Sequence, residues 1–407
     1  MPTIDTIVIG GGQAGLAASR CLTARGRDHV VLERGRVGER WHSETWDSLH
    51  LLTPNWMNTL PDWAYRGGDP DGFMSAGEFA VHLTGYARSF AAPVEEDSGV
   101  EAVRRNGDGF VVVTESGSYR AATVIVATGW CDRPAIPTIA RDLDARVAQF
   151  APRDYRRPDE LPPGGVLVVG ASATGVQLAD ELRASGRDVT LAVGAHTRVP
   201  RRYRGIDIFW WLGRIGLLDR TIDQMPDAAR ARREPSLQLV GGRVHRSLDL
   251  ATLRAAGVRL VGRVVAADGR RVRLAGDLAR TIADAHRGAA RLLAAIDCHI
   301  DEEGLHAEFL DPEPLAPVPL EPAVEELDLG ADGITTVVWA TGHRRSYDWL
   351  QVPVLDASGE IRQRRGVTPV PGLYVLGQRF QHRRSSNFIG GVGRDAAFVA
   401  DQITAAR

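Results

Sequence analysis

A strand, a glycine-rich turn and a helix follow one another twice in this chain, and this repeat constrains the fold more than any other feature. The first copy has an apolar run over residues 3–9, the turn GGGQAG at 10–15 and a small-residue helix. The second has an apolar run over 166–169 and the turn GASATG at 170–175. A further apolar strand follows each helix, which completes a βαβ unit. The sequence therefore predicts an α/β fold built on two such units.

The glycines of the first copy are typical of a dinucleotide-binding turn. Gly10 allows the tight turn, Gly12 lets the backbone approach a pyrophosphate, and Gly15 lets the helix pack on the strand. The helix N-terminus offers free N–H groups and a positive dipole end to the phosphates. Glu33 ends the next strand, where a carboxylate accepts hydrogen bonds from ribose hydroxyls. Both copies together predict two Rossmann-like dinucleotide-binding domains.

The second copy differs at two positions. Ser172 replaces the middle glycine, and Thr174 stands where a nucleophile elbow needs glycine, so Ser172 is interpreted as a phosphate contact. Val193 occupies the position equivalent to Glu33, and no acid is nearby. The basic residues that follow are His196, Arg198, Arg201 and Arg202. An arginine binds a 2′-phosphate that a carboxylate would repel, which favours NADPH over NADH. The alternative is that this run is a solvated face.

Composition excludes several other classes of function. The net charge of −2, from 49 basic and 51 acidic residues, gives no footprint for nucleic acid or for a membrane surface. The cysteines, at 21, 131 and 298, are too far apart to suggest a disulfide framework, a zinc site or a dithiol centre. The 11 histidines show no metal-binding spacing, so no metal is expected. No apolar run reaches the ~18 residues of a membrane span, and the early first strand leaves no room for a signal peptide. We expect a reduced, cytoplasmic protein.

Proline-rich connections and repeated strand ends predict the domain boundaries. Strands over 124–129 and 337–342 both end in Ala-Thr-Gly, and prolines cluster between 134 and 163 and between 312 and 322. We expect residues 1–160 to hold the first domain with its linker, 161–335 the second domain with a helical insertion, and 336–407 the return to the first. A capping box at 75–78 predicts a helix to about residue 89, and apolar spacing predicts another over 278–300.

Taken in order, these motifs resemble the flavin-containing monooxygenase family (class B), with auxin-forming and Baeyer–Villiger enzymes as relatives. The resemblance spans nearly the whole chain. It rests on the unit over 10–33, the motif GERW at 38–41, the segment 46–54, both Ala-Thr-Gly ends, the second glycine turn, and the segments 372–377 and 390–396. Disulfide reductases share the two-nucleotide architecture but carry a redox cysteine pair, which this chain lacks.

The resemblance implies FAD in the first domain and NADPH in the second, with the NADPH domain inserted into the FAD domain. The residues expected at FAD are Gly10, Gly12, Gln13, Ala14, Gly15, Glu33, Arg34, Arg40, Trp41, Val100, Ala127, Thr128, Gly129, Gly377, Gly391 and Val392. Those expected at NADPH are Gly170, Ser172, Thr174, Gly175, His196, Arg198 and Arg201. A helix beginning at Val392 suits the negative charge of reduced flavin.

Two positions depart from the family pattern. The identifying motif of the family has a histidine before its aromatic residue, whereas here Tyr155 is preceded at that position by Ala151. Leu52 stands where the family usually places an asparagine that helps to hold the oxygenated flavin. His50 is a second candidate near the flavin, as a donor or as an ordinary wall residue. Arg379, Arg383 and Arg384 flank the last flavin segment, where they bind an acidic substrate or a cofactor phosphate, or form a solvated face.

The resemblance implies a monooxygenase that uses FAD and NADPH. It would insert one oxygen atom of O2 into a nitrogen, sulfur or carbonyl centre of a small substrate through a C4a-hydroperoxyflavin, with no protein nucleophile. Leu52 favours an alternative, an NAD(P)H oxidase or quinone-type reductase without oxygenation. A third hypothesis, a non-catalytic flavoprotein, is disfavoured by the intact second unit. The expected partners are the small substrate and O2, and an oligomer stays open.

Overall fold

A mixed sheet and a parallel sheet form the framework of the computed structural model, which describes residues 1–242 and 244–406. The first sheet has the order β21-β4-β5-β6-β1-β2-β3, with β22 on β6. The second has the order β15-β10-β9-β19-β8. The strands of the first sheet are β1 (Thr3–Ile9), β2 (His29–Leu32), β3 (Val94–Glu95), β4 (Val100–Asn106), β5 (Gly109–Thr114), β6 (Gly117–Val126), β21 (Leu350–Gln351) and β22 (Leu373–Val375). Those of the second are β8 (Ala148–Phe150), β9 (Gly165–Val169), β10 (Val189–Ala192), β15 (Arg259–Val261) and β19 (Ile334–Trp339).

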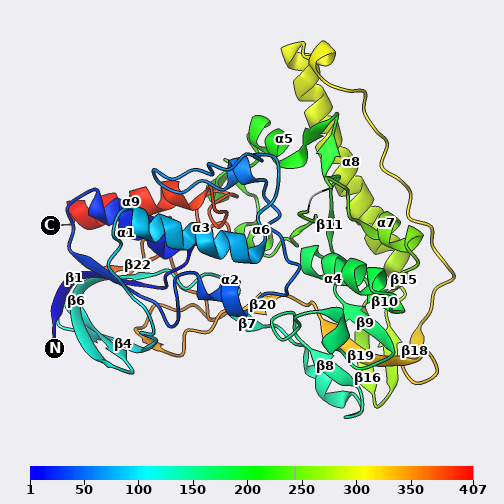
Figure 1. Cartoon of the computed structure of the whole chain (residues 1–407), viewed down its shortest axis with the longest axis horizontal. Coiled ribbons are helices and arrows are strands. Elements are labelled where there is room, and N and C mark those ends of the chain that lie inside the picture. The colour runs from blue at the N-terminus through cyan, green and yellow to red at the C-terminus, as the bar shows by residue number, and fades with distance from the viewer. Residues whose placement is uncertain (243, 407) are drawn as a thin grey trace.

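Helices and short ribbons complete the chain (Figure 1). The helices are α1 (Gln13–Thr23), α2 (Glu39–Ser43), α3 (Ala76–Ser89), α4 (Ala173–Ala184), α5 (Ile208–Arg214), α6 (Ala228–Arg232), α7 (Leu250–Ala255), α8 (Leu278–Glu303) and α9 (Val392–Ala405). Single 3-10 turns lie at Asn55–Met57, Thr138–Asp142, Pro158–Glu160, Ile222–Gln224 and His306–Glu308. Three small sheets have two strands each: β7 (Arg133–Pro134) with β20 (His343–Arg344), β11 (Thr197–Arg198) with β14 (Leu237–Gln238), and β12 (Arg202–Tyr203) with β13 (Ile206–Asp207). A fourth small sheet has three strands, β16 (Val264–Asp268), β17 (Arg271–Leu274) and β18 (Glu326–Asp328).

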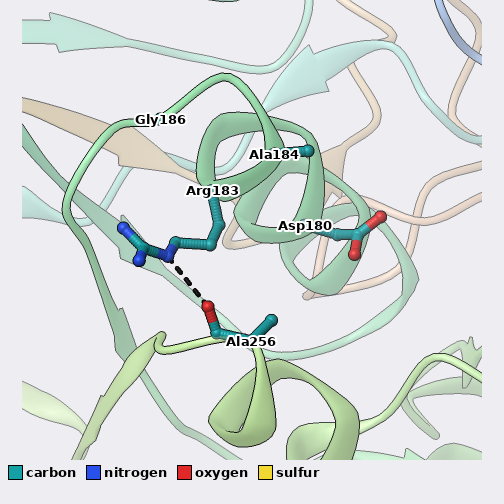
Figure 2. A pocket seen from close by; sticks show the side chains of 5 residues that line it. All are labelled: Asp180, Arg183, Ala184, Gly186 and Ala256. Atoms are coloured by element: carbon teal, nitrogen blue, oxygen red, sulfur yellow. Dashed lines mark hydrogen bonds between the residues drawn. The ribbon is translucent and has the colours of Figure 1, made fainter.

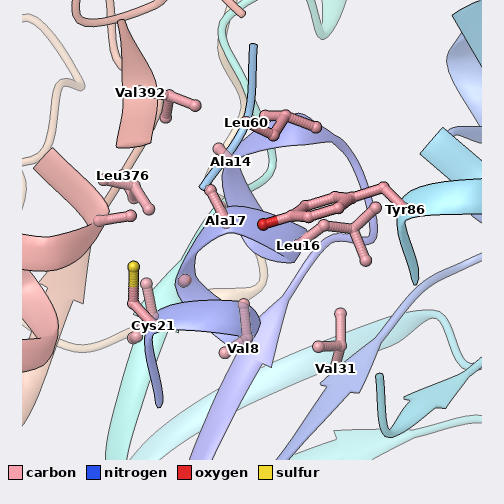
Figure 3. Packing of buried hydrophobic residues seen from close by; sticks show 14 of the residues in the cluster. Val8, Ala14, Leu16, Ala17, Cys21, Val31, Leu60, Tyr86, Leu376 and Val392 are labelled. Atoms are coloured by element: carbon pink, nitrogen blue, oxygen red, sulfur yellow. The ribbon is translucent and has the colours of Figure 1, made fainter. Parts of the chain in front are cut away.

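The first sheet is assembled from both ends of the chain. β1 runs parallel to β2 and β6, and β22 runs parallel to β6. Val8 of β1 faces Val31 and Ile125 across the register, and all three are fully buried. Figure 3 shows Ala14 and Ala17 of α1 on the side of Leu376 and Val392, and Leu16 on the side of Tyr86, all in one buried cluster with Val8 and Val31. Small side chains let α1 lie close to the sheet, and this closeness places its N-terminus at the end of β1.

The second sheet is formed by residues that lie between those of the first. Its strands β8, β9, β10, β15 and β19 are all parallel neighbours and span 148–339. This order agrees with the predicted α/β class and with two dinucleotide-type units. β8 and β19 join the second sheet, although the predicted boundaries placed 148–150 and 336–339 with the first domain. The domain boundaries themselves stay a prediction.

Several local predictions agree with the structure. Ser75 and Glu78 form a capping box at the start of α3, and α8 covers the predicted helix over 278–300. α8 is amphipathic and buries one face that includes Leu293, Ile296 and Ile300. In the part of the chain that the structure describes, no helix combines the length and apolar character that crossing a bilayer requires.

Candidate functional site: two dinucleotide-type turns

The first glycine turn has open space where a phosphate would lie. A Cβ added to Gly15 would lie 1.8 Å from the carbonyl oxygen of Gly10, so only glycine lets the helix approach the strand. A Cβ added to Gly12 would meet no atom within 4 Å. The space over Gly12 lies at the N-terminus of α1, beside Gln13 and Ala14. The close packing at Gly15 brings α1 onto the strand, and the free space at Gly12 leaves room for a pyrophosphate at the helix N-terminus.

Glu33 lies where the sequence predicts the ribose-binding acid. Its carboxylate accepts hydrogen bonds from the backbone N–H of Gly11 at 2.5 Å and of Gly35 at 3.2 Å. The N–H of Ser98 donates to its backbone carbonyl at 2.7 Å, which brings the start of β4 alongside. Arg34 consequently lies near Gly99, which directly precedes Val100, and it pairs with Glu44. The structure thus gathers Glu33, Arg34 and Val100 around one end of the turn.

The remaining predicted FAD residues converge from four elements. Ala127, Thr128 and Gly129 follow β6, and Gly377 follows β22, where an added Cβ would lie 2.7 Å from Ala14. Gly391 precedes Val392, the first residue of α9. Figure 3 shows Ala14, Leu376 and Val392 close together. Arg40 bonds the Cys131 carbonyl and the Asp132 carboxylate, and Trp41 packs edge-on against Phe79 at 4.9 Å.

Buried polar atoms near the end of β22 lack partners among the described residues. Nε2 of Gln378, Nε2 of Gln381 and Oδ2 of Asp395 are buried without a hydrogen bond. Burial raises the pKa of Asp395, which sits in the first turn of α9. Orphaned donors beside Gly377 and a helix N-terminus beside Gly391 suit the hydroxyl-rich and anionic parts of a flavin dinucleotide. The sequence prediction had not included these three side chains, although their place after Gly377 and Gly391 was visible.

The second glycine turn repeats the geometry of the first. Gly170 has φ +109°, close to the +110° of Gly10, and a Cβ on Gly175 would lie 1.8 Å from the Gly170 oxygen. Ser172 is the N-cap residue of α4, and its side chain makes no capping hydrogen bond. Thr174 lies in the first turn of the same helix. These features fit a second pyrophosphate, with the Ser172 hydroxyl available to it.

Arg198 and Arg201 are engaged inside the protein. Arg198 is 4% exposed and forms an ion pair with Asp249 at 2.6 Å, and it also donates to the Ala316 carbonyl at 2.7 Å. Arg201 is 0% exposed and pairs with Asp207 at 2.5 Å. Buried carboxylates neutralise both guanidinium groups, which disfavours their predicted contact with a 2′-phosphate; that contact stays a prediction. The solvated-face alternative is wrong for both.

A different arginine lies at the end of β10. Arg263 comes two residues after β15, the parallel neighbour of β10, and its Cδ lies 4.0 Å from an added Cβ on Gly194. Its side chain is 59% exposed, with one contact to Asp277 at 3.4 Å. His196 also lies there, but burial lowers its pKa, so it offers a hydrogen bond rather than a charge. The signal that was missed is a Gly-Arg pair directly after a strand, at 262–263.

We expect Arg263→Ala to weaken NADPH binding and to leave NADH binding nearly unchanged. Loss of a charge-assisted phosphate contact predicts about a ten- to hundredfold rise in the Kd for NADPH. Titration of both cofactors into the variant measures this preference. The control is Arg259→Ala, which removes an arginine of β15 that is paired with Asp332. An equal loss for both cofactors would refute the assignment.

His50 and Leu52 lie at the junction between the two halves of the site. Nδ1 of His50 bonds the Ser48 carbonyl at 2.9 Å, and a Cβ added to Gly241 would lie 3.0 Å from its Cβ. The carbonyl of Leu52 accepts from Nη1 of Arg201 at 2.8 Å. Its half-buried side chain packs against an apolar cluster that includes Phe209 and is joined by Met57 and Phe388. Leu52 therefore contributes an apolar wall.

A surface hollow lies away from both turns (Figure 2). It is lined by Asp180, Arg183, Ala184, Gly186 and Ala256, at the C-terminal end of α4. Arg183 donates to the Ala256 carbonyl there at 2.9 Å. Since dinucleotides bind at the N-terminal end of such a helix, this hollow has no part in the site.

Two parallel βαβ units, each with a glycine turn at the start of its helix, are typical of an oxidoreductase that binds two dinucleotides. The family model described as pyridine nucleotide-disulphide oxidoreductase matches residues 7–204. A CzcO-like oxidoreductase of Geobacillus kaustophilus is 32% identical over 403 residues, covering 98% of both chains. The chain belongs to this family of CzcO-like oxidoreductases.

Other comparisons confirm the resemblance to flavin-containing monooxygenases. The probable indole-3-pyruvate monooxygenase YUCCA1 of Arabidopsis thaliana is 30% identical over 209 residues, which is 50% of each chain. The flavin-containing monooxygenase of Stenotrophomonas maltophilia has the same fold, with a TM-score of 0.70 and 21% identity over 100% of this chain and 99% of that one. These matches support an enzyme that uses a flavin and a pyridine nucleotide, as predicted.

Proposed function

We propose that this chain is an FAD-dependent monooxygenase that uses NADPH in the cytoplasm. The proposed reaction takes a small substrate, NADPH, a proton and O2 to an oxygenated substrate, NADP+ and water. The observation that best supports this proposal is that one chain has two dinucleotide-type turns of the same geometry and lacks a redox cysteine pair. Among the described residues the three cysteines are all free, with Cys21 buried and Cys298 exposed. FAD, when bound at the first glycine turn, would supply the oxygen-activating chemistry.

The chain itself contributes binding, orientation and exclusion of water. The inserted region after β13 (Ile206–Asp207) docks on the segment that follows β22, where Ile222 N–H donates to the His382 carbonyl at 2.7 Å. Ser385 N–H donates to the Leu218 carbonyl at 3.1 Å. Phe209 of this region meets Phe388 edge-on at 5.9 Å. These contacts cover the proposed flavin segment with an apolar layer, which favours oxygenation over loss of peroxide to water.

The runner-up function is an NADPH oxidase or quinone-type reductase. In that reaction NADPH, a proton and O2 give NADP+ and hydrogen peroxide. Leu52 is the observation that favours it, because a side chain without polar atoms stands at the position of the family asparagine. The third hypothesis, a non-catalytic flavoprotein, is disfavoured because such a protein would need neither the second glycine turn nor a free Ser172 hydroxyl.

The test combines three measurements on the purified FAD-loaded protein. Anaerobic NADPH should bleach the flavin, which a non-catalytic flavoprotein would not allow. A panel of amines, sulfides and ketones under 18O2 should then give a product that carries one labelled oxygen atom. Hydrogen peroxide formed in equimolar amount to NADPH, with no labelled product from any class, would favour the oxidase.

Leu52 should partly uncouple NADPH oxidation from oxygenation of the substrate. We expect the wild type to release a substantial part of its NADPH electrons as hydrogen peroxide, and Leu52→Asn to lower that part because the amide adds a hydrogen-bond donor beside the flavin. The amide enters an apolar cluster, so we also expect a loss of about 1–3 kcal/mol in the free energy of unfolding. Leu52→Ala, which adds no donor, should not lower the peroxide yield per NADPH. A wild type with almost no peroxide would contradict this, and His50 would become the first candidate for the donor.

A further inference from the structure

The three arginines that flank the last flavin segment differ in their partners. Arg384 forms an ion pair with the Glu234 carboxylate, and Arg383 lies 3.9 Å from Asp219. Arg379 has no carboxylate within ion-pair distance among the residues that the structure describes. Its Nη2 donates instead to the backbone carbonyl of Glu234. Its guanidinium carbon lies 5.4 Å from the ring centroid of Trp130.

The charge around Arg379 does not balance. Arg379 and Arg384 both bind Glu234, but that residue supplies a single carboxylate and Arg384 occupies it. The neighbouring Arg40 is balanced by Asp132 at 2.8 Å, and Arg345 is balanced by Glu360. One positive charge therefore remains at Arg379. The Arg379 side chain is half-buried, so its charge is partly withdrawn from water, and this burial lowers the pKa of the guanidinium from its ordinary value. A desolvated cation stacked on an aromatic ring favours an anion as its partner.

Arg379 lies between the two predicted cofactor sites. It comes two residues after Gly377, at the end of β22. Trp130 directly follows Gly129, and its ring lies 6.3 Å from that of His343, which directly follows Gly342. Strand ends of the first and the second sheet thus meet here, and Glu234 brings in the inserted region. A group bound by Arg379 would lie near the junction where hydride and oxygen chemistry is proposed.

We propose that Arg379, stacked on Trp130, binds a carboxylate of the substrate. The proposal rests on the monooxygenase function and narrows it to small organic acids. The pyrophosphates of the cofactors already have their places at the two helix N-termini, beside Gly12 and Ser172. A guanidinium has five N–H donors, and the Glu234 carbonyl takes up only Nη2, so donors remain for a planar carboxylate.

The experiment measures binding without turnover. Phenylacetate and phenylacetamide, which differ in charge at the same shape, are titrated calorimetrically into the oxidised FAD-loaded protein in the presence of NADP+. We expect wild type to bind phenylacetate at least about tenfold tighter than the amide. Arg379→Gln, which removes the charge but keeps a polar side chain, should abolish this difference and leave phenylacetamide binding unchanged. Arg383→Gln, the matched control on the same segment, should keep the difference.

Three results would overturn the proposal. The first is equal binding of the two probes by wild type. The second is an unchanged difference in Arg379→Gln. The third is an Arg379→Gln variant that loses FAD or NADP+ while still preferring phenylacetate, which would make this residue a cofactor ligand. A protein that binds phenylacetate through Arg379 but turns all its NADPH electrons into peroxide would refute the oxygenation and leave the carboxylate site standing.

Discussion

Replacing Gly12 with valine is expected to give a folded, colourless protein. The φ of Gly12 is −83°, which any residue adopts, and an added Cβ meets no atom within 4 Å. The fold therefore tolerates the side chain. Its two methyl groups fill the space in which the pyrophosphate must approach the N-terminus of α1. We expect the FAD content to fall below about a tenth of the wild-type value at an unchanged melting temperature of the apoprotein.

Two further variants separate a lost cofactor from a lost fold. Gly77 lies in α3 with equally open space, so Gly77→Val is the matched control and should keep its FAD. Gly15→Ala should instead lose the fold, because its Cβ would lie 1.8 Å from the Gly10 oxygen and α1 could not pack on β1. The readouts are the flavin absorbance after purification and the far-UV circular dichroism. A yellow, fully loaded Gly12→Val protein would remove this turn from the FAD site.

The parts of the fold that the sequence predicts well are those encoded by neighbouring residues. Each βαβ unit is specified within about 30 residues, so both turns, with their glycines at matching φ values, were predictable. The capping box of α3 and the apolar stripe of α8 are equally local, since residues three or four apart decide them. Boundaries between the sheets were less predictable, because β8 and β19 join the second sheet through partners distant in sequence.

Side-chain roles that depend on distant partners could not be predicted. Arg198 is neutralised by Asp249, and nothing near Arg198 in the sequence signals that pair. Arg263 reaches the end of β10 only because β15 lies beside it in the sheet. The unbalanced charge at Arg379 depends on Glu234 of the inserted region, 145 positions earlier. A run of arginines in sequence therefore separates in space into buried structural cations and accessible ones.

The ion pair of Arg198 should make a large contribution to stability. Asp249 accepts from Nε and Nη2 of Arg198, at 2.8 and 2.6 Å, and also caps α7 through the N–H of Thr252 at 3.0 Å. Arg198→Ala leaves this carboxylate buried and unpaired, and it removes a donor from the Ala316 carbonyl. Such a loss costs about 3–5 kcal/mol in the free energy of unfolding. Arg157, whose pairing with Asp159 is exposed, is the control, and Arg157→Ala should cost about 0–1 kcal/mol.

A double variant tests whether the loss in the free energy of unfolding comes from the unpaired charge of Asp249. Asp249→Asn keeps an oxygen for the cap of α7 but removes the charge, so Arg198→Met with Asp249→Asn should be more stable than Arg198→Ala alone. Urea denaturation of wild type, Arg198→Met, Asp249→Asn and the variant that combines both changes gives the coupling between the two positions. If the buried pair takes no part in binding the 2′-phosphate, as its burial suggests, Arg198→Ala should bind NADPH and NADH in the wild-type ratio once it is folded. A variant with wild-type stability that loses NADPH alone would restore Arg198 as a phosphate ligand, and the buried pair would then have to open in the complex.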